Sequence, residues 1–212
     1  MAVVGGGDFD LDDFRRVDHE FDWVISADAG TLRLLESGIQ PHLAVGDFDT
    51  TGDERLKWIQ EKGIPLIHLP VEKAMTDLHY AIQEAIKRKP MEIFIFGALG
   101  GARIDHALAN IGLLEWIDEQ GVKAIMVHRH NRLRLLAGPA EVSLKKEGYT
   151  YVSLIPVSKQ VEGITTHGML YPLHEGVLIR GQTLGISNEI KEDVACIQIR
   201  QGKCLLVESS DA

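Results

Sequence analysis

The chain has 212 residues, which allows one large domain or two small ones. Its hydrophobic share of 45% is typical of a globular protein with a buried core, and its formal net charge of −9 argues against a general nucleic-acid binder. Only two cysteines occur, Cys196 and Cys204, and no apolar run approaches the roughly 20 residues that span a bilayer, so we expect a cytoplasmic protein with no membrane partner.

Over roughly the first 130 residues, short apolar runs alternate with amphipathic segments. The apolar runs, which predict strands, are Ala2–Val4, Trp23–Ala27, Leu43–Val45, Pro65–Leu69, Ile93–Phe96 and Ala124–Val127. The amphipathic segments, which predict helices, are Leu11–Val17, Thr31–Ser37, Glu54–Lys62, Asp77–Arg88 and His106–Gln120. This alternation predicts an α/β domain with a mostly parallel sheet and helices on both faces.

After Gly138 the pattern changes to short β-rich pieces separated by turn residues. The pieces are Glu141–Leu144, Tyr149–Ile155, Gly163–Leu170, Val177–Ile179, Val194–Arg200 and Lys203–Val207. We therefore expect two domains: the α/β domain over residues 1–138, and a compact antiparallel β-sandwich or barrel over residues 139–212.

The stretch "AVGDFDTT" places two carboxylates directly after a predicted strand. Asp47 and Asp49 are two residues apart, so in extended geometry they point the same way. Like charges about 4 Å apart repel each other by roughly 1 kcal/mol in water, and by more when they are partly buried. A divalent cation between them would offset this repulsion, which makes the pair a candidate metal site.

Three other predicted strand or helix ends carry polar side chains. "SADAG" supplies Asp28, followed by Gly30 for close backbone approach; "EKAMTDL" and "GGARIDH" supply Lys73, Thr76, Asp77, Arg103, Asp105 and His106. Taken singly, Asp77 and Asp105 fit helix caps and Lys73 fits a solvated charge. Because ligands of α/β sheets bind beyond the carboxyl ends of the strands, their shared placement predicts a Mg²⁺–phosphate site. The P-loop pattern GxxxxGK[ST] is absent from the sequence.

In order along the chain, "ADAG", "GDFDT", "EKAMTDLHYA", "GALGGARIDHALANIGLL" and "GMLYPL…GISNE" resemble the thiamine pyrophosphokinase family over nearly the whole length. The resemblance implies an ATP-binding α/β domain followed by a thiamine-binding β-sandwich domain. It also implies a homodimer with active sites between subunits. The implied reaction moves a diphosphate group from ATP to the thiamine hydroxyl and leaves AMP.

The resemblance also implies roles for individual residues. Asp47, Asp49 and Asp77 would hold Mg²⁺ at the ATP phosphates as catalytic residues, and Asp49 or Asp77 would accept the proton of the thiamine hydroxyl. The residues expected on the ATP and phosphate side are Asp28, Lys73, Thr76, Arg103, Asp105 and His106. Those expected to receive thiamine are Tyr171, Ser187 and Asn188. Tyr171 fits equally well an amphipathic residue at a domain edge.

Two other functions remain open on the sequence alone. "GDFDTT" also resembles the DxDx[TV] motif of haloacid-dehalogenase-type phosphatases, in which Asp47 would be a nucleophile. A nucleotide- or vitamin-binding sensor without turnover is the other. The basic segment Arg129–Arg134 alternates as a strand does, so we expect a solvated basic face there, with contact to the nucleotide as the alternative.

Overall fold

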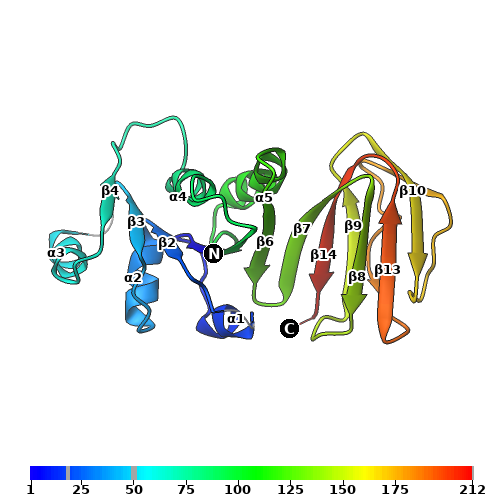
Figure 1. Ribbon diagram of the computed structural model, residues 1–212, viewed down its shortest axis with the longest axis horizontal. Coiled ribbons are helices and arrows are strands. Elements are labelled where there is room, and N and C mark those ends of the chain that lie inside the picture. Colours follow the sequence, from blue (N-terminus) through cyan, green and yellow to red (C-terminus); the bar gives the residue numbers. More distant parts are fainter. Residues whose placement is uncertain (18–19, 49–51, 212) are drawn as a thin grey trace. The chain divides into compact units, whose positions relative to one another are not determined.

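The computed structural model describes residues 1–17, 20–48 and 52–211, apart from the side chains of residues 53 and 54. The chain divides into two compact units, Met1–Arg129 and His130–Ala212 (Figure 1). This division after Arg129 lies one strand before the boundary expected after Gly138. The difference arises because Asn131–Ala137 pairs with the C-terminal strand of the second unit. No helix in the described part of the chain is long and apolar enough to cross a membrane.

A parallel sheet forms the centre of the first unit. Its strands are β1 (Ala2–Val4), β2 (Val24–Ala27), β3 (Leu43–Gly46), β4 (Leu66–His68), β5 (Glu92–Phe96) and β6 (Lys123–His128). They lie in the order β6-β5-β1-β2-β3-β4, and each neighbouring pair is parallel. The central strands β1, β2 and β3 are buried along their whole length, which explains why they are almost entirely apolar in sequence.

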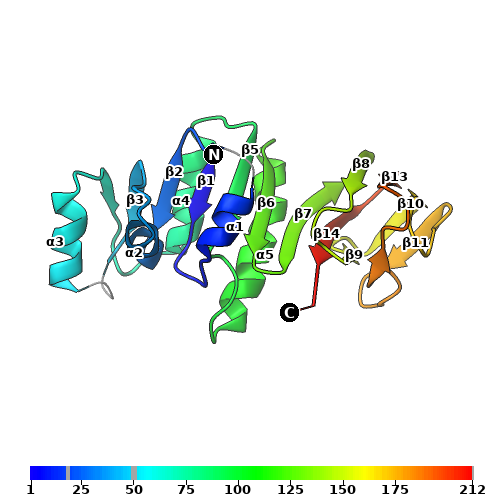
Figure 2. The same ribbon diagram turned by 90° about the horizontal axis from the view of Figure 1, so that it is seen from below.

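Helices cover both faces of this sheet, as predicted (Figures 1 and 2). They are α1 (Leu11–Arg16), α2 (Ala29–Glu36), α3 (Asp53–Glu61), α4 (Asp77–Ile86) and α5 (Ile104–Glu119). Helices α4 and α5 lie on one face, α1 and α2 lie on the other, and α3 lies beside α2. The face of α4 that packs on the sheet carries Leu78, Ala81, Ile82 and Ala85 at helical spacing. Each helix thus follows the carboxyl end of a strand and begins near the same rim.

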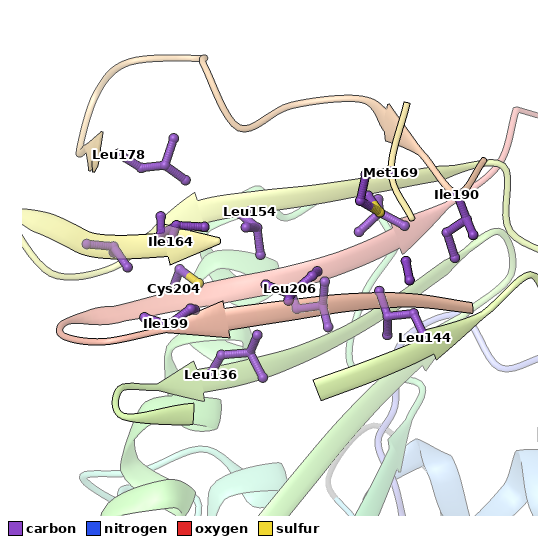
Figure 3. Packing of buried hydrophobic residues seen from close by; sticks show 14 residues of the cluster. Leu136, Leu144, Leu154, Ile164, Met169, Leu178, Ile190, Ile199, Cys204 and Leu206 are labelled. Carbon is purple, nitrogen blue, oxygen red and sulfur yellow. The ribbon is translucent and has the colours of Figure 1, made fainter. Parts of the chain in front are cut away.

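The second unit is a β-sandwich of antiparallel strands. They are β7 (Asn131–Ala137), β8 (Ala140–Lys145), β9 (Tyr151–Pro156), β10 (Gln160–His167), β11 (Gly176–Ile179), β12 (Asn188–Glu189), β13 (Val194–Ile199) and β14 (Lys203–Ser209). Within this unit the strand orders are β12-β9-β14-β7 in one sheet and β11-β10-β13-β8 in the other. Inward-facing residues of both sheets, among them Leu154, Ile164, Ile199 and Leu206, form one apolar core (Figure 3).

The expectation of a solvated basic face at Arg129–Arg134 is wrong for Arg132 and Arg134. Both guanidinium groups are ion-paired with Glu208 of β14, whose side chain is only 2% exposed. Arg132 binds it in a bidentate manner at 2.6 and 2.8 Å. The alternation of charges along β7 therefore matches a buried acid on the neighbouring strand, which the local sequence does not reveal. Arg129 contacts Asp8 through its guanidinium group at 3.4 Å.

Candidate active site

A cavity of about 280 Å³ opens at the rim where the carboxyl ends of β1, β2 and β5 meet. Its polar side chains are Asp28, Thr76, Asp77, Arg103, His106 and Asn110. The first five of these belong to the set predicted from sequence to share this rim. The structure therefore brings together side chains from segments that lie far apart in the chain.

Backbone of two glycine-containing turns, after β1 and after β5, also lines the cavity. The N–H of Gly7 donates to the carbonyl of Gly97 at 2.7 Å, so the turns lie directly against each other. Gly97 has φ +59°, and a Cβ there would lie 2.4 Å from the carbonyl oxygen of Gly5. Any side chain at this position would push the turns apart. A wall of exposed backbone is suited to phosphate groups, which accept hydrogen bonds from N–H groups.

Asp28 holds an unusual backbone conformation between β2 and α2. Its φ and ψ angles are 45° and −121°. Residues with a side chain rarely adopt this region, because it costs them about 1–3 kcal/mol. Its N–H donates to the carbonyl of Val45 at 2.8 Å, which fixes the turn. The close approach expected at Gly30 is present, since a Cβ there would lie 2.4 Å from the carbonyl oxygen of Val4. The surrounding fold thus fixes the backbone of Asp28, whose side chain borders the cavity.

Asp47, Lys73 and Asp77 form a cluster beside this cavity. Asp47 follows β3, Asp77 is the first residue of α4, and Lys73 lies in the connection between β4 and α4. The Lys73 ammonium is paired with the Asp47 carboxylate, and it lies 3.2 Å from Oδ1 of Asp77. Burial lowers the pKa of Lys73, but its hydrogen bonds to the two carboxylates outweigh this effect and raise that pKa above its ordinary value. Asp49, the other acid of the "GDFDTT" motif, lies outside the described residues.

The start of α5 supplies a second group of predicted residues. Arg103 binds both carboxylate oxygens of Asp105, with Nε–Oδ1 at 3.1 Å, and this hydrogen-bonded pairing lowers the pKa of Asp105. Both side chains are exposed, and of this pair only Arg103 is among the residues that line the cavity. His106 lines it from the first turn of the helix. At the start of α4, Thr76 caps the helix by accepting a hydrogen bond from the N–H of His79 at 3.3 Å.

Asn110 was not predicted, although it lines the same cavity. Its side chain is buried, and Nδ2 donates to the carbonyl of Ala98 at 2.6 Å, which ties α5 to the turn after β5. A signal was present in the sequence, because Asn110 lies four residues after His106 and therefore on the same side of the helix. An asparagine is common on helix surfaces, so the spacing alone did not single it out.

The second unit contains its own cavity, of about 270 Å³ and mostly apolar lining, to which Tyr171 and Asn188 contribute. The Asn188 amide bridges the backbone of Tyr171: Oδ1 accepts from its N–H at 3.0 Å, and Nδ2 donates to its carbonyl at 2.7 Å. The Tyr171 side chain stays 65% exposed. Ser187 has φ +58°, and its N–H donates to Oγ of Ser153 at 2.9 Å. Two of the three predicted thiamine-binding residues thus border one cavity.

Family models divide the chain in the same way as its two folded units. Residues 14–126 match the model described as "Thiamin pyrophosphokinase, catalytic domain", and residues 141–204 match "Thiamin pyrophosphokinase, vitamin B1 binding domain". The chain belongs to the thiamine pyrophosphokinase family. The resemblance inferred from the sequence motifs is therefore confirmed.

Relatives of known name and structure agree with this family. The chain is 34% identical over 214 residues to the thiamine pyrophosphokinase of Bacillus subtilis strain 168, covering 100% of this chain and 99% of that protein. The crystal structure of thiamine pyrophosphokinase from B. subtilis is similar with a TM-score of 0.92 and 31% identity, over 100% of this chain and 99% of that one. That from Geobacillus thermodenitrificans has a TM-score of 0.87 and 34% identity, over 100% and 97%. A thiamine pyrophosphokinase fold, and not a haloacid-dehalogenase fold, thus accounts for the whole chain.

The acids of the site in this family member fit a divalent cation. In the described part of the chain, no three His, Cys, Asp or Glu side chains form a cluster able to hold a metal ion. Asp47 and Asp77, however, already share one cation, the Lys73 ammonium, and all three side chains are at least three-quarters buried. Carboxylates that converge on one positive charge are suitable ligands for Mg²⁺, which binds proteins through one or two carboxylates together with substrate phosphates.

Proposed function

We propose that this chain is a Mg²⁺-dependent thiamine pyrophosphokinase, which transfers the diphosphate group of ATP to the hydroxyl of thiamine and releases AMP. The observation that carries the proposal is the rim of the first unit, where a cation-sharing pair of carboxylates stands beside a glycine-walled cavity. The names of the matching family models and of the B. subtilis relative support thiamine as the acceptor.

The acids of the rim would hold the metal. We assign Asp47 and Asp77 to it, together with Asp49, the second acid of the "GDFDTT" motif. Bound Mg²⁺ would neutralise charge on the phosphate oxygens as the bond to AMP breaks. Transfer of this type depends on positioning and electrostatics. Asp49 or Asp77 would accept the proton of the attacking hydroxyl, in preference to His106.

The cations and helix ends of the same rim would hold the nucleotide. Lys73 and Arg103 would pair with phosphate oxygens, since both lie at or beside the cavity. Backbone N–H groups of the glycine turns would donate to the same phosphates. Asp28, Thr76, Asp105 and His106 would complete the nucleotide side.

The second unit would bind thiamine. The flat face of Tyr171, which is exposed and held through its backbone by Asn188, suits a cationic aromatic ligand, and Ser187 directly precedes Asn188 in the sequence. We also propose a homodimer, with each active site formed between subunits, and a cytoplasmic location. Two free thiols, Cys196 and Cys204, are in keeping with a reducing compartment.

One assay tests the activity directly. The protein is incubated with ATP, Mg²⁺ and thiamine, and we expect AMP and thiamine diphosphate in equal amounts, with little AMP when thiamine is left out. Asp77→Asn should lower kcat by about 100-fold or more and keep the circular-dichroism spectrum, because it removes a ligand of the cation that would neutralise the developing phosphate charge, and electrostatic contributions of this kind are worth roughly 3–4 kcal/mol. Phosphate release without thiamine would indicate a phosphatase instead, and ATP binding without turnover would indicate a sensor.

A further inference from the structure

Lys73 is the counter-ion of the two acids that we assign to the metal. Its side chain is 8% exposed, and those of Asp47 and Asp77 are 10% and 22% exposed. The ammonium contacts Oδ2 of Asp47 and Oδ1 of Asp77. Without it, two poorly solvated carboxylates would face each other across a few ångströms, at an electrostatic cost well above that of the same pair in water.

The same oxygens cannot be fully used by two cations at once. A divalent ion held by Asp47 and Asp77 would lie within a few ångströms of the ammonium that now contacts both carboxylates, and two like charges at that distance repel strongly. We therefore expect metal binding at this pair to displace the Lys73 ammonium. Because the lysine stem is flexible, the ammonium can move while its backbone stays in place.

A nucleotide bound at the rim would supply a new partner for the displaced ammonium. Asp77, which it contacts, lines the glycine-walled cavity of the rim. A polyphosphate in this cavity would place anionic oxygens beside the cluster. The ammonium would then pair with phosphate oxygens in place of the carboxylates, so Lys73 would stay ion-paired throughout.

We propose that Lys73 is an exchangeable counter-cation, which the metal displaces from Asp47 and Asp77 and which then pairs with the phosphates of the nucleotide. The inference rests on the proposed function for the identity of both ligands. Its consequence is thermodynamic: metal alone binds weakly because it must displace a paired lysine, whereas metal and nucleotide bind cooperatively. Lys73 thus acts as a binding residue that couples the two ligands.

The test measures metal binding without turnover. The Mn²⁺ dissociation constant of the full chain is determined by electron paramagnetic resonance, with and without the analogue α,β-methylene-ATP. In the unaltered protein we expect weak binding of Mn²⁺ alone, and binding at least about tenfold tighter with the analogue, the scale typical of coupled sites. In Lys73→Met we expect Mn²⁺ alone to bind about tenfold more tightly and the analogue to add correspondingly less.

Lys87→Met is the matched control. Lys87 pairs with Glu84 at the other end of α4 and is 67% exposed, so this variant loses the same charge without touching the rim. It should leave both Mn²⁺ dissociation constants unchanged. If Lys73→Met bound Mn²⁺ no more tightly than the unaltered protein, or kept the full effect of the analogue, the exchange would be refuted.

A second readout covers the case that Lys73→Met folds poorly. Lys73→Gln keeps hydrogen-bond donors but removes the charge, so its Mn²⁺ affinity should rise in the same direction. In the presence of a chelator, both Lys73 variants should melt at a lower temperature than the unaltered protein. Addition of Mg²⁺ alone should remove most of this deficit. An equal deficit with and without Mg²⁺ would contradict the proposal. These outcomes are independent of the thiamine assay, so a chain that makes no AMP can still pass or fail here.

Discussion

At the scale of single residues, the most constrained position of the rim is Asp28. Its positive φ is imposed by the hydrogen bond to Val45 and by the close packing at Gly30, and its carboxylate lines the cavity. Strain of this kind persists where the surrounding structure holds it, and it is concentrated at functional sites. A carboxylate held there at the expense of stability is more easily explained by a ligand than by folding.

Asp28→Gly separates these two roles. Glycine adopts the observed φ and ψ without the strain of about 1–3 kcal/mol, but it costs roughly 0.5–1 kcal/mol in chain entropy, so we expect the free energy of unfolding to stay unchanged or to rise by up to about 2 kcal/mol. Loss of the carboxylate should lower kcat/KM for ATP by about tenfold or more, a loss of at least roughly 1.4 kcal/mol of transition-state binding. Urea unfolding and steady-state kinetics check the two parts. A large loss of stability with unchanged kinetics would make Asp28 a structural residue.

At the scale of elements, the pairing of β7 with β14 shows how a strand outside the active site is specified. Arg132 and Glu208 are direct cross-strand partners in the antiparallel register, and Arg134 reaches the same carboxylate from the same face of β7. A shift of one residue would place Glu208 opposite Asn131 or Leu133 instead of Arg132. The ion pairs therefore help to select the register of the second unit.

Removing Glu208 should destabilise this unit. In Glu208→Ala two partly buried guanidinium groups lose their common partner, so we expect a loss of about 2–4 kcal/mol in the free energy of unfolding. The control is Glu175→Ala, because the pair of Glu175 with Arg200 is 68% and 60% exposed, and such pairs contribute less than about 1 kcal/mol. Urea denaturation compares the two. Equal effects would show that burial of Glu208 is not what makes its pairs matter.

The buried Cys204 thiol in β14 should make the free energy of unfolding depend on pH in the alkaline range. Burial raises the pKa of the Cys204 thiol from 9.0 to about 12, so the folded chain keeps a proton that the unfolded chain releases. This contribution to stability is complete below pH 9 and is lost as the pH rises from 9 towards 12, by roughly 1.4 kcal/mol per unit. Cys204→Ala lacks the effect, so its difference in unfolding free energy from the unaltered protein should shrink between pH 8 and 10. A constant difference would contradict the assignment.

At the scale of the whole molecule, each unit leaves large apolar side chains in solvent. Ile104 and Leu108, one turn apart on α5, are 71% and 62% exposed, and in the second unit Leu184 and Tyr171 are 66% and 65% exposed. Apolar side chains grouped in this way are typical of surfaces that bind another molecule. They are in keeping with the homodimer that we propose.

Light scattering coupled to size-exclusion chromatography tests this assembly. For a chain of 23.5 kDa we expect a particle of twice this mass, independent of protein concentration in the micromolar range. If strong dilution dissociates the dimer, activity should fall together with the particle mass, since each site would need both subunits. A monomer with full thiamine pyrophosphokinase activity would contradict an active site between subunits.

The sequence by itself determined most of the elements, the fold class and the family. Periodicity of burial is a local property, so the strands and helices of the first unit were predicted to within about two residues at most ends, the usual limit for boundaries. The rim was predictable as well, because parallel strands place their carboxyl ends together, and Asp28, Thr76, Asp77, Arg103 and His106 do line one cavity.

Only the tertiary structure decided the strand order β6-β5-β1-β2-β3-β4, the burial of Glu208 against Arg132, the place of Asn110 and the position of Lys73 between two acids. Each of these depends on a contact between segments far apart in the chain. The free energy of such contacts comes from packing and burial, which no local window of sequence contains.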